Sequence, residues 1–247
     1  MRYFLELSYN GKAYHGWQNQ PNAISVQEVL EKALTTLLRK PIAIVGAGRT
    51  DAGVHALQMF AHFDYTNKIN RNEILFKLNS FLPNDIALQD IFEVKKDSHA
   101  RFDAVSRTYM YRISLEKDPF NFERAYFINN ELDIDKMNEA SKILLDYSDF
   151  ECFSKVKTEV KTFNCNIIKA EWVKQGNEMH FTIKADRFLR NMVRAIVGTL
   201  VGIGSGKIDV NDMHAIIKSK NRSNAGYSVP AHALYLSKIE YPKDIKI

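Results

Sequence analysis

The sequence predicts an α+β protein with mainly antiparallel sheets, arranged as two similar halves. Three observations support this fold class. A hydrophobic content of 45% over 247 residues is enough for one large domain or two small ones. Strand and helix periodicities follow one another in the order β-α-β-β-α-β over residues 1–94. The second half nearly repeats this order, although no repeat of the amino acids themselves is visible.

The first half contains four predicted strands and two predicted helices. Residues 2–9 alternate between apolar and polar side chains, as a half-buried strand does. Ser25 and Glu28 form a capping box that begins a helix, and apolar residues at helical spacing continue this helix to residue 38. The other predicted elements are strands at 42–45, 59–65 and 86–94, with alternation in the second, and a helix at 72–82 that Pro83 ends.

The second half shows a similar order of elements. Strands are predicted at 106–115, 163–173, 179–185 and 234–240, and helices at 135–145, 188–203 and 210–219. This order predicts two ferredoxin-like (RRM-like) α/β halves side by side. The expected subdomains are residues 1–103 and 104–247, with a joint near residues 95–102.

Composition favours an anionic partner and excludes several classes of protein. The formal net charge is +5 and the pI is near 9.0, which permits nucleic acid without requiring it. Two cysteines are too few for a disulfide scaffold, and the scattered histidines lack ligand spacing, so no metal is expected. The N-terminus lacks the features of a signal peptide. The longest apolar stretch, residues 195–203, is too short for a membrane span, so we expect a cytoplasmic protein with no membrane association.

A glycine-rich turn, GAGRTDAGVHA at residues 46–56, is the first chemical signal. A dinucleotide-binding turn needs glycine at its first, third and sixth positions, but Asp51 occupies the sixth and would repel a phosphate. A Walker loop is excluded because no Gly-Lys-Ser or Gly-Lys-Thr follows at the required distance. The turn therefore presents Asp51 for chemistry, or it is only a turn.

The stretch SRTYMYRI combines an arginine with two aromatic residues. Strand alternation places Arg107, Tyr109 and Tyr111 on one face. Such a set suits an unpaired nucleotide, because aromatic rings stack on bases and guanidinium groups hold phosphates. A half-buried strand with a solvated arginine is the alternative interpretation.

The stretch DRFLRNMVRAIVG carries arginines three and four residues apart, at Arg187, Arg190 and Arg194. This spacing predicts one basic stripe on a helix whose other side is apolar. The stripe could meet phosphates, pair with a carboxylate or be an ordinary solvated face, and periodicity alone does not separate these three alternatives.

The string GRTDAGVHA and five further stretches resemble the tRNA pseudouridine synthase I family (TruA type), in the same order and over nearly the whole chain. The further stretches are YNGKAYHGWQNQ (9–20), LNSFLPNDI (78–86), HARFDAVSRTYMYRI (99–113), FLRNMVRAIVGTLVGIGSGK (188–207) and AGYSVPAHALYL (225–236). The resemblance implies an enzyme that detaches uracil from its ribose within tRNA and rejoins it through carbon 5, without cofactor or metal. It further implies an active-site cleft between the two halves, action at positions 38, 39 and 40 of the anticodon stem-loop, and a homodimer that cradles one tRNA.

The resemblance also assigns roles to residues at the matching positions. Asp51 is expected to be the catalytic carboxylate, acting on the sugar or the base, and Arg194 is expected to pair with it and keep it ionised. Tyr109 is expected to stack on the target base, and Arg49 to help hold the nucleotide out of the helix. The remaining candidates for substrate binding are Tyr111, Arg107 and Arg190.

Nearby residues receive structural interpretations. Thr50 and Gly53 are expected to shape the loop so that the aspartate points outward. A structural hydrogen bond is favoured for His55. Trp17 could contact RNA or pack in the core, and a single tryptophan is more often core.

Two other classes of function stay open at this point. A catalytically silent RNA-binding module would keep the basic and aromatic residues without needing the pair of Asp51 and Arg194. A glycosidase-like hydrolase acting on nucleosides would need a second carboxylate, for which Asp103 and Asp186 are the candidates.

Overall fold

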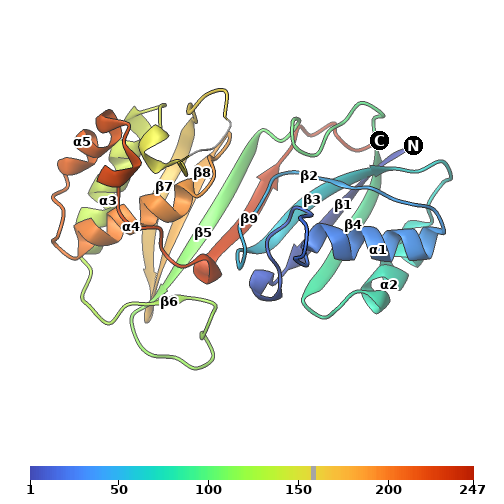
Figure 1. Cartoon of the computed structure of the whole chain (residues 1–247), viewed down its shortest axis with the longest axis horizontal. Helices are drawn as coiled ribbons and strands as arrows, with labels where there is room; N and C mark the ends of the chain where they lie inside the picture. Colours follow the sequence, from blue (N-terminus) through green and yellow to red (C-terminus); the bar gives the residue numbers. More distant parts are fainter. Residues whose placement is uncertain (157–159) are drawn as a thin grey trace. The chain divides into compact units, whose positions relative to one another are not determined.

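The computed structural model describes residues 1–156 and 160–247 and shows a mixed α and β structure (Figure 1). The strands are β1 (Arg2–Tyr9), β2 (Val45–Gly46), β3 (His55–Asp64), β4 (Ile86–Val94), β5 (Ser106–Ser114), β6 (Tyr126–Phe127), β7 (Ile167–Gln175), β8 (Glu178–Ala185) and β9 (Leu234–Glu240). The helices are α1 (Val26–Leu38), α2 (Arg71–Phe81), α3 (Ile134–Ile143), α4 (Met192–Gly204) and α5 (Asp212–Ser219). Most strand pairs are antiparallel, which confirms the predicted α+β class. In the part of the chain described, no helix is long and apolar enough to cross a membrane.

The chain divides into two compact units. The first unit comprises Met1–Val105 together with Tyr235–Ile247, and the second comprises Ser106–Leu234. The first unit has the predicted order β-α-β-β-α-β, and the C-terminal segment adds most of β9 to it. The ferredoxin-like description of each half and its subdomain boundaries stay predictions.

In the first unit the strands lie in the order β4-β1-β3-β9. β1 is antiparallel to both neighbours, and Leu5 lies opposite Ala61 on β3 and Ile91 on β4. α1 and α2 contact each other, and α2 packs on β4 (Figure 1). The predicted helix start is confirmed, because Ser25 Oγ accepts a hydrogen bond from the Glu28 backbone N–H at 3.1 Å.

β3 begins at His55, directly after the glycine-rich turn and four residues before the predicted start at residue 59. Both of its faces are buried, as Met59, Phe60 and His62 show. The ring of Tyr241, near the end of the chain, meets Phe60 edge-on at 5.1 Å and covers the second face. A strand buried on both faces loses the simple alternation by which its bounds were predicted.

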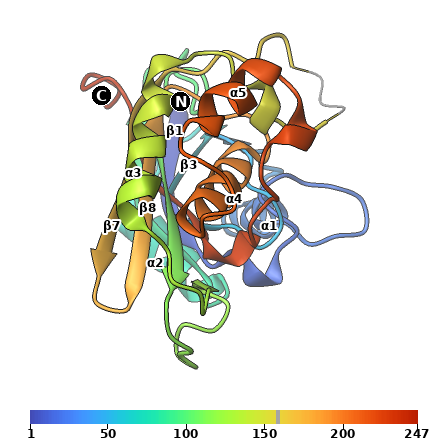
Figure 2. The same ribbon diagram turned by 90° about the vertical axis from the view of Figure 1, so that its left-hand side faces the viewer.

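In the second unit β8 lies between β5 and β7, and both pairs are antiparallel. β8 alternates between buried and partly exposed residues along its whole length, from Glu178 to Ala185. α3 packs against β7, and α4 packs against α3 (Figure 2). Helices thus cover one face of this sheet, which explains the regular alternation of β8.

α4 begins at Met192, four residues later than predicted. Asn191 precedes it in a left-handed conformation with φ of 66°, which interrupts the helical path. Arg187 and Arg190 therefore lie before the helix, and the predicted stripe of three arginines on one helix is wrong. Arg194 is the member of the three that α4 carries.

The middle of α4 touches the segment 225–230 backbone to backbone. A Cβ added at Gly198 would lie 1.8 Å from the Tyr227 carbonyl oxygen, and a Cβ at Gly226 would lie 2.4 Å from the Thr199 nitrogen. Glycine is therefore required on both sides of this contact, because any side chain would separate the two backbones.

Replacing Gly198 by alanine is expected to destabilise the protein by about 2 to 3 kcal/mol, because the new methyl group meets a backbone atom that has no rotamer to change. Gly202→Ala, on the same helix, is the matched control. There the new Cβ meets only the flexible end of Ile208, and the gain in helix propensity offsets the contact. Urea denaturation measures both variants, and equal stability of the two would contradict this packing analysis.

Candidate active site

The turn that carries Asp51 connects β2 to β3 in the first unit. Gly53 has φ of 79°, a conformation that favours glycine, and the Val54 N–H donates to the Asp51 carbonyl oxygen at 3.2 Å. Asp51 is partly exposed and Arg49 is exposed, whereas Thr50 between them is buried. Thr50 and Gly53 thus shape the loop, and the outward direction expected for the Asp51 side chain stays a prediction.

The last residue of β1 and the chain that follows it hold this turn through three hydrogen bonds. The hydroxyls of Tyr9 and Thr50 lie 2.8 Å apart in a buried hydrogen bond. The Trp17 N–H donates to the Thr50 carbonyl oxygen at 3.3 Å, and the Gly53 N–H donates to the Tyr14 carbonyl oxygen at 3.3 Å. The residues on either side of the turn aspartate are thereby fixed to the body of the first unit.

Two glycines allow this close approach. A Cβ at Gly11 would lie 2.0 Å from the Val54 carbonyl oxygen, and a Cβ at Gly16 would lie 2.3 Å from the Thr50 carbonyl oxygen. The segment Tyr9 to Trp17, which we call the turn clamp, therefore packs its own backbone against the turn. The stretch YNGKAYHGW is explained by this packing.

His55 and Trp17 have structural roles in this unit. His55 is buried, its Nδ1 accepts a hydrogen bond from the Gly11 N–H at 3.0 Å, and its ring stacks on Tyr235 at 4.7 Å. The structural hydrogen bond predicted for His55 is confirmed. Trp17 is 1% exposed and belongs to the core.

The second unit carries the other candidates on β5 and near α4. Tyr109 is partly exposed, and its ring meets that of Phe188 edge-on at 5.1 Å. Arg107 Nη1 donates to the Asp186 carbonyl oxygen at 2.9 Å. Both residues are partly exposed.

Tyr111 differs from Tyr109 although strand alternation puts both on one face. Its side chain is wholly buried, and its hydroxyl donates to the Pro230 carbonyl oxygen at 3.0 Å. Burial raises the pKa of Tyr111 above its ordinary value, so this hydroxyl stays protonated. In this arrangement Tyr111 supports the strand and presents no ring surface to a base.

Arg194 is partly exposed and is bound to the chain segment next to Pro230. Its Nε donates to the Val229 carbonyl oxygen at 2.7 Å, and its own carbonyl oxygen accepts from the Val229 N–H at 3.3 Å. Arg190 is exposed, and its carbonyl oxygen accepts from the Lys155 N–H at 3.0 Å. One short segment, residues 229–230, therefore contacts both Arg194 and Tyr111.

The two acids considered as second carboxylates are occupied by backbone groups. Asp103 Oδ2 accepts a hydrogen bond from the His99 N–H at 2.8 Å. Asp186 Oδ1 accepts from the N–H groups of Asn166 at 2.8 Å and Arg187 at 2.7 Å. Such contacts are typical of turn-forming carboxylates and weaken the hydrolase interpretation.

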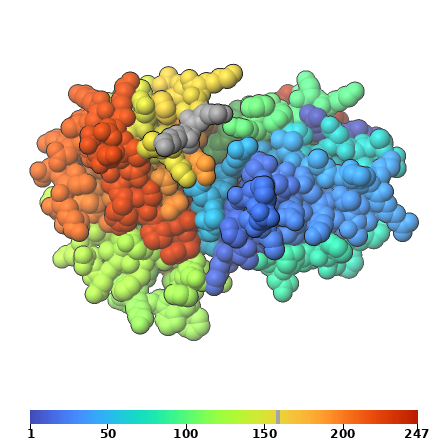
Figure 3. Space-filling view, in the orientation of Figure 1, coloured from blue at the N-terminus to red at the C-terminus, as the bar shows by residue number. Residues whose placement is uncertain are grey.

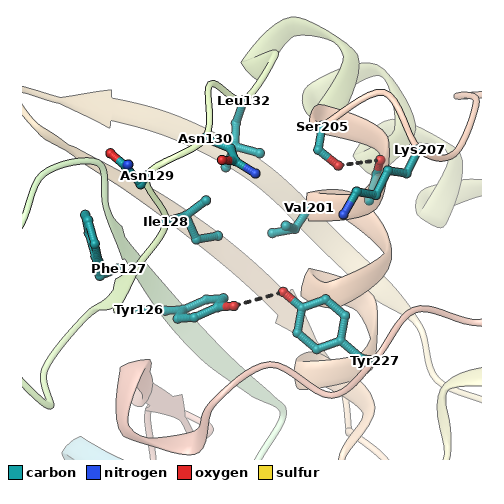
Figure 4. A pocket seen from close by; sticks show the side chains of 11 residues that line it. Tyr126, Phe127, Ile128, Asn129, Asn130, Leu132, Val201, Ser205, Lys207 and Tyr227 are labelled. Carbon is teal, nitrogen blue, oxygen red and sulfur yellow. Dashed lines mark hydrogen bonds between the residues drawn. The ribbon is translucent and has the colours of Figure 1, made fainter.

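A pocket of about 300 Å³ lies within the second unit, between the chain around β6 and the end of α4 (Figure 4). The hydroxyls of Tyr126 and Tyr227 lie 3.2 Å apart at one side of it. Ile128 and Val201 face each other across it (Figure 4). Its lining consists of Tyr126, Phe127, Ile128, Asn129, Asn130, Leu132, Val201, Gly202, Ser205, Lys207 and Tyr227. None of the predicted site residues lines this pocket.

The segment between β5 and β6 exposes two large apolar rings, Phe120 at 87% and Phe122 at 73%. The space-filling view has this segment at the surface of the second unit (Figure 3). Exposed aromatic rings close together in sequence are typical of interaction surfaces.

The cysteines offer no nucleophile. Cys152 and Cys165 are buried, and burial raises the pKa of each thiol to about 12. Among the residues that the structure describes, no group of three or more His, Cys, Asp or Glu side chains could hold a metal ion.

The segment that orients Arg194 could not be predicted from the sequence. The stretch AGYSVPAHALYL carries part of the family resemblance, but its residue types indicate no role for its members. Its contacts to Arg194 and Tyr111 are made by the backbone carbonyls of Val229 and Pro230. Every residue has such a carbonyl, so no side-chain pattern signals its use.

Comparison with known proteins agrees with the resemblance seen in the sequence. A family model described as tRNA pseudouridine synthase matches residues 7–103 and 140–242. The chain is 53% identical over 247 residues to the tRNA pseudouridine synthase A of Parabacteroides distasonis, with 99% of this chain and 97% of that protein covered. It is 54% identical over 246 residues to the same-named protein of Bacteroides fragilis, with 99% and 98% covered. For that of Bacillus licheniformis the identity is 40% over 245 residues, with 98% and 99% covered. These matches extend along almost the whole chain, and the chain therefore belongs to the tRNA pseudouridine synthase family.

Proposed function

We propose that this protein isomerises uridine to pseudouridine in the anticodon stem-loop of tRNA, at positions 38, 39 and 40. The observation that carries the proposal is the 53% identity to a tRNA pseudouridine synthase A over 99% of the chain. The net charge of +5 supports a polyanionic substrate. The glycine-rich turn supports it further, because its neighbours are fixed while its aspartate stays partly exposed.

The reaction balances without an oxidant, a reductant or a transferred group. The bond between ribose C1′ and uracil N1 breaks, the base turns, and a bond from C1′ to C5 forms. The proton on C5 leaves to solvent, and N1 gains a proton. The protein must therefore expose one uridine, stabilise the separated base and sugar, and accept the C5 proton.

We assign the catalytic carboxylate to Asp51. It acts on the sugar or the base of an everted uridine, and for this it must be ionised. A closed site disfavours a charged carboxylate, whereas a fixed guanidinium offsets that cost. We assign this guanidinium to Arg194, since arginine stays charged and can give two donors to one carboxylate.

The other candidates hold the substrate in this proposal. Tyr109 stacks on the target base. Arg49 replaces contacts that the RNA stem loses when the nucleotide leaves the base stack. Arg107 and Arg190 bind phosphates near the target. Tyr111 supports this surface from below, since its ring is wholly buried.

We further propose that the protein works in the cytoplasm as a homodimer that needs no cofactor. Two-fold symmetry would double the basic surface available to a substrate far larger than a 28.4 kDa subunit. The exposed rings of Phe120 and Phe122 support an interface between copies, because they add apolar surface outside the proposed site.

Two rival functions receive less support. A silent RNA-binding module would not need a half-buried aspartate fixed on both sides. A nucleoside hydrolase would need a second carboxylate, and the backbone contacts of Asp103 and Asp186 leave those acids with a turn-forming role.

Loss of the Asp51 carboxylate is expected to abolish isomerisation while leaving RNA binding intact. A tRNA transcript carrying tritium at C5 of uridine should release its label with the wild-type protein. With Asp51→Asn, which keeps the shape of the side chain, the rate should fall by at least about a thousandfold. The affinity for tRNA, measured by filter binding, should stay within about threefold, since each contact to the RNA backbone remains.

Asp103→Asn is the matched control, because it removes a carboxylate of the same unit that accepts a hydrogen bond from a backbone N–H. It should release tritium at close to the wild-type rate. Release persisting in Asp51→Asn would remove that residue from catalysis. Free uracil from the wild type would favour the hydrolase, and bound but unreacted tRNA would favour the silent module.

A further inference from the structure

Arg222 makes hydrogen bonds within the segment that contacts Arg194. Its Nη1 donates to the carbonyl oxygens of Gly226 at 2.9 Å and Ala225 at 3.4 Å, and its Nη2 donates to Ser228 Oγ at 2.9 Å. We call residues 222–230 the strap. A single planar guanidinium bonds three of its residues, so Arg222 sets the path of the strap.

The strap is also fixed to α4 at two points, the middle of the helix and the residue that precedes it. The Gly226 N–H donates to Thr199 Oγ1 at 2.8 Å, within the close backbone contact described above. At the start of the helix, the side-chain amide of Asn191 donates to Ser228 Oγ at 2.6 Å. Ser228 therefore receives hydrogen bonds from both Asn191 and Arg222, which links the strap to the point where α4 begins.

The last strap residues contact two of the proposed site residues directly. The Val229 carbonyl oxygen accepts from Arg194 Nε at 2.7 Å, and the Pro230 carbonyl oxygen accepts from the Tyr111 hydroxyl at 3.0 Å. Because a guanidinium is planar, a bond at Nε fixes the plane in which its two Nη groups lie. The position of the Val229 carbonyl thus determines where Arg194 presents those groups.

We propose that Arg222 is a positioning residue for Arg194. It holds the strap, the strap holds the Val229 carbonyl, and that carbonyl sets the orientation of the Arg194 guanidinium. This inference rests on the proposed function, in which Arg194 keeps Asp51 ionised. Arg222 itself touches neither the RNA nor the reacting atoms in this scheme.

Loss of the Arg222 guanidinium would leave the carbonyls of Ala225 and Gly226 without this hydrogen-bond donor, and the strap would be free to move. Arg222→Met keeps the length and apolar stem of the side chain but removes its donors. A displacement of about 1 Å at a catalytic group costs on the order of a hundredfold in rate. We therefore expect the single-turnover rate at saturating tRNA to fall by roughly tenfold to a hundredfold. Arg222→Lys should recover part of the loss, since an ammonium reaches one acceptor but not all three.

The experiment compares Arg222→Met, Arg222→Lys and the wild type in tritium release, tRNA affinity and thermal unfolding. Arg2→Met is the matched control. Arg2 also makes three hydrogen bonds, two to Asp64 and one to the Ser98 carbonyl oxygen, but it lies in the first unit and contacts no proposed site residue. It should lower the unfolding temperature while the saturated rate stays within about twofold of wild type, since no catalytic contact is lost.

A double-mutant cycle separates positioning from general stability. In an Arg194→Lys background, whose residual rate is followed over longer times, Arg222→Met should cause less than a twofold further loss, because the oriented group is already absent. The tRNA affinity of Arg222→Met should equal that of the wild type.

The outcomes are distinct. An inactive wild type would overturn the proposed function, and this inference with it. An active wild type with an equally active Arg222→Met would overturn the inference alone. The inference would also be overturned if Arg222→Met lowered the rate by the same factor in the Arg194→Lys background as in the wild type. The same conclusion would follow if Arg2→Met, at an equal loss of thermal stability, lowered the rate as much as Arg222→Met.

Discussion

The buried hydrogen bond between Tyr9 and Thr50 is the constraint on which the proposed site depends. A charged residue in a surface loop normally samples many positions, and fixing it costs conformational entropy. Here hydrogen bonds to neighbouring residues offset that entropy, since the turn clamp binds the backbone on both sides of Asp51. The carboxylate keeps its place while its own surface stays partly exposed. Glycines in the clamp and in the turn are needed because their backbones lie in contact.

In the second unit, backbone contacts likewise hold a positively charged residue, Arg194. Arg194 is oriented by a backbone carbonyl, and that carbonyl belongs to a strap held by another arginine and by close packing on α4. Each charged group thus has its position set by backbone contacts that other side chains support. Preorganised charges of this kind stabilise a transition state without reorganisation during the reaction, which suits a reaction that must separate a base from its sugar and rejoin the two.

Much of the fold could be predicted from the sequence because its signals are local. The bounds of β1, β4 and β9 were predicted to the residue, and the capping box predicted the start of α1. The start of β3 was predicted wrongly because the strand begins at His55, inside the glycine-rich stretch 46–56 that was interpreted as a turn. The arginine stripe failed because Asn191 delays α4, a backbone event that residue spacing does not reveal. The strap was missed because its contacts to Arg194 and Tyr111 are made by carbonyls that carry no sequence signal.

The most direct test is a crystal structure of the Asp51→Asn variant with an RNA hairpin of the anticodon arm. We expect one uridine out of the stem, with its ribose against the residue 51 amide, its base on the ring of Tyr109, and the Arg194 guanidinium within hydrogen-bonding distance of that amide. A uridine still stacked in the stem, or one bound away from residue 51 with Arg194 turned elsewhere, would contradict the assignment of the active site.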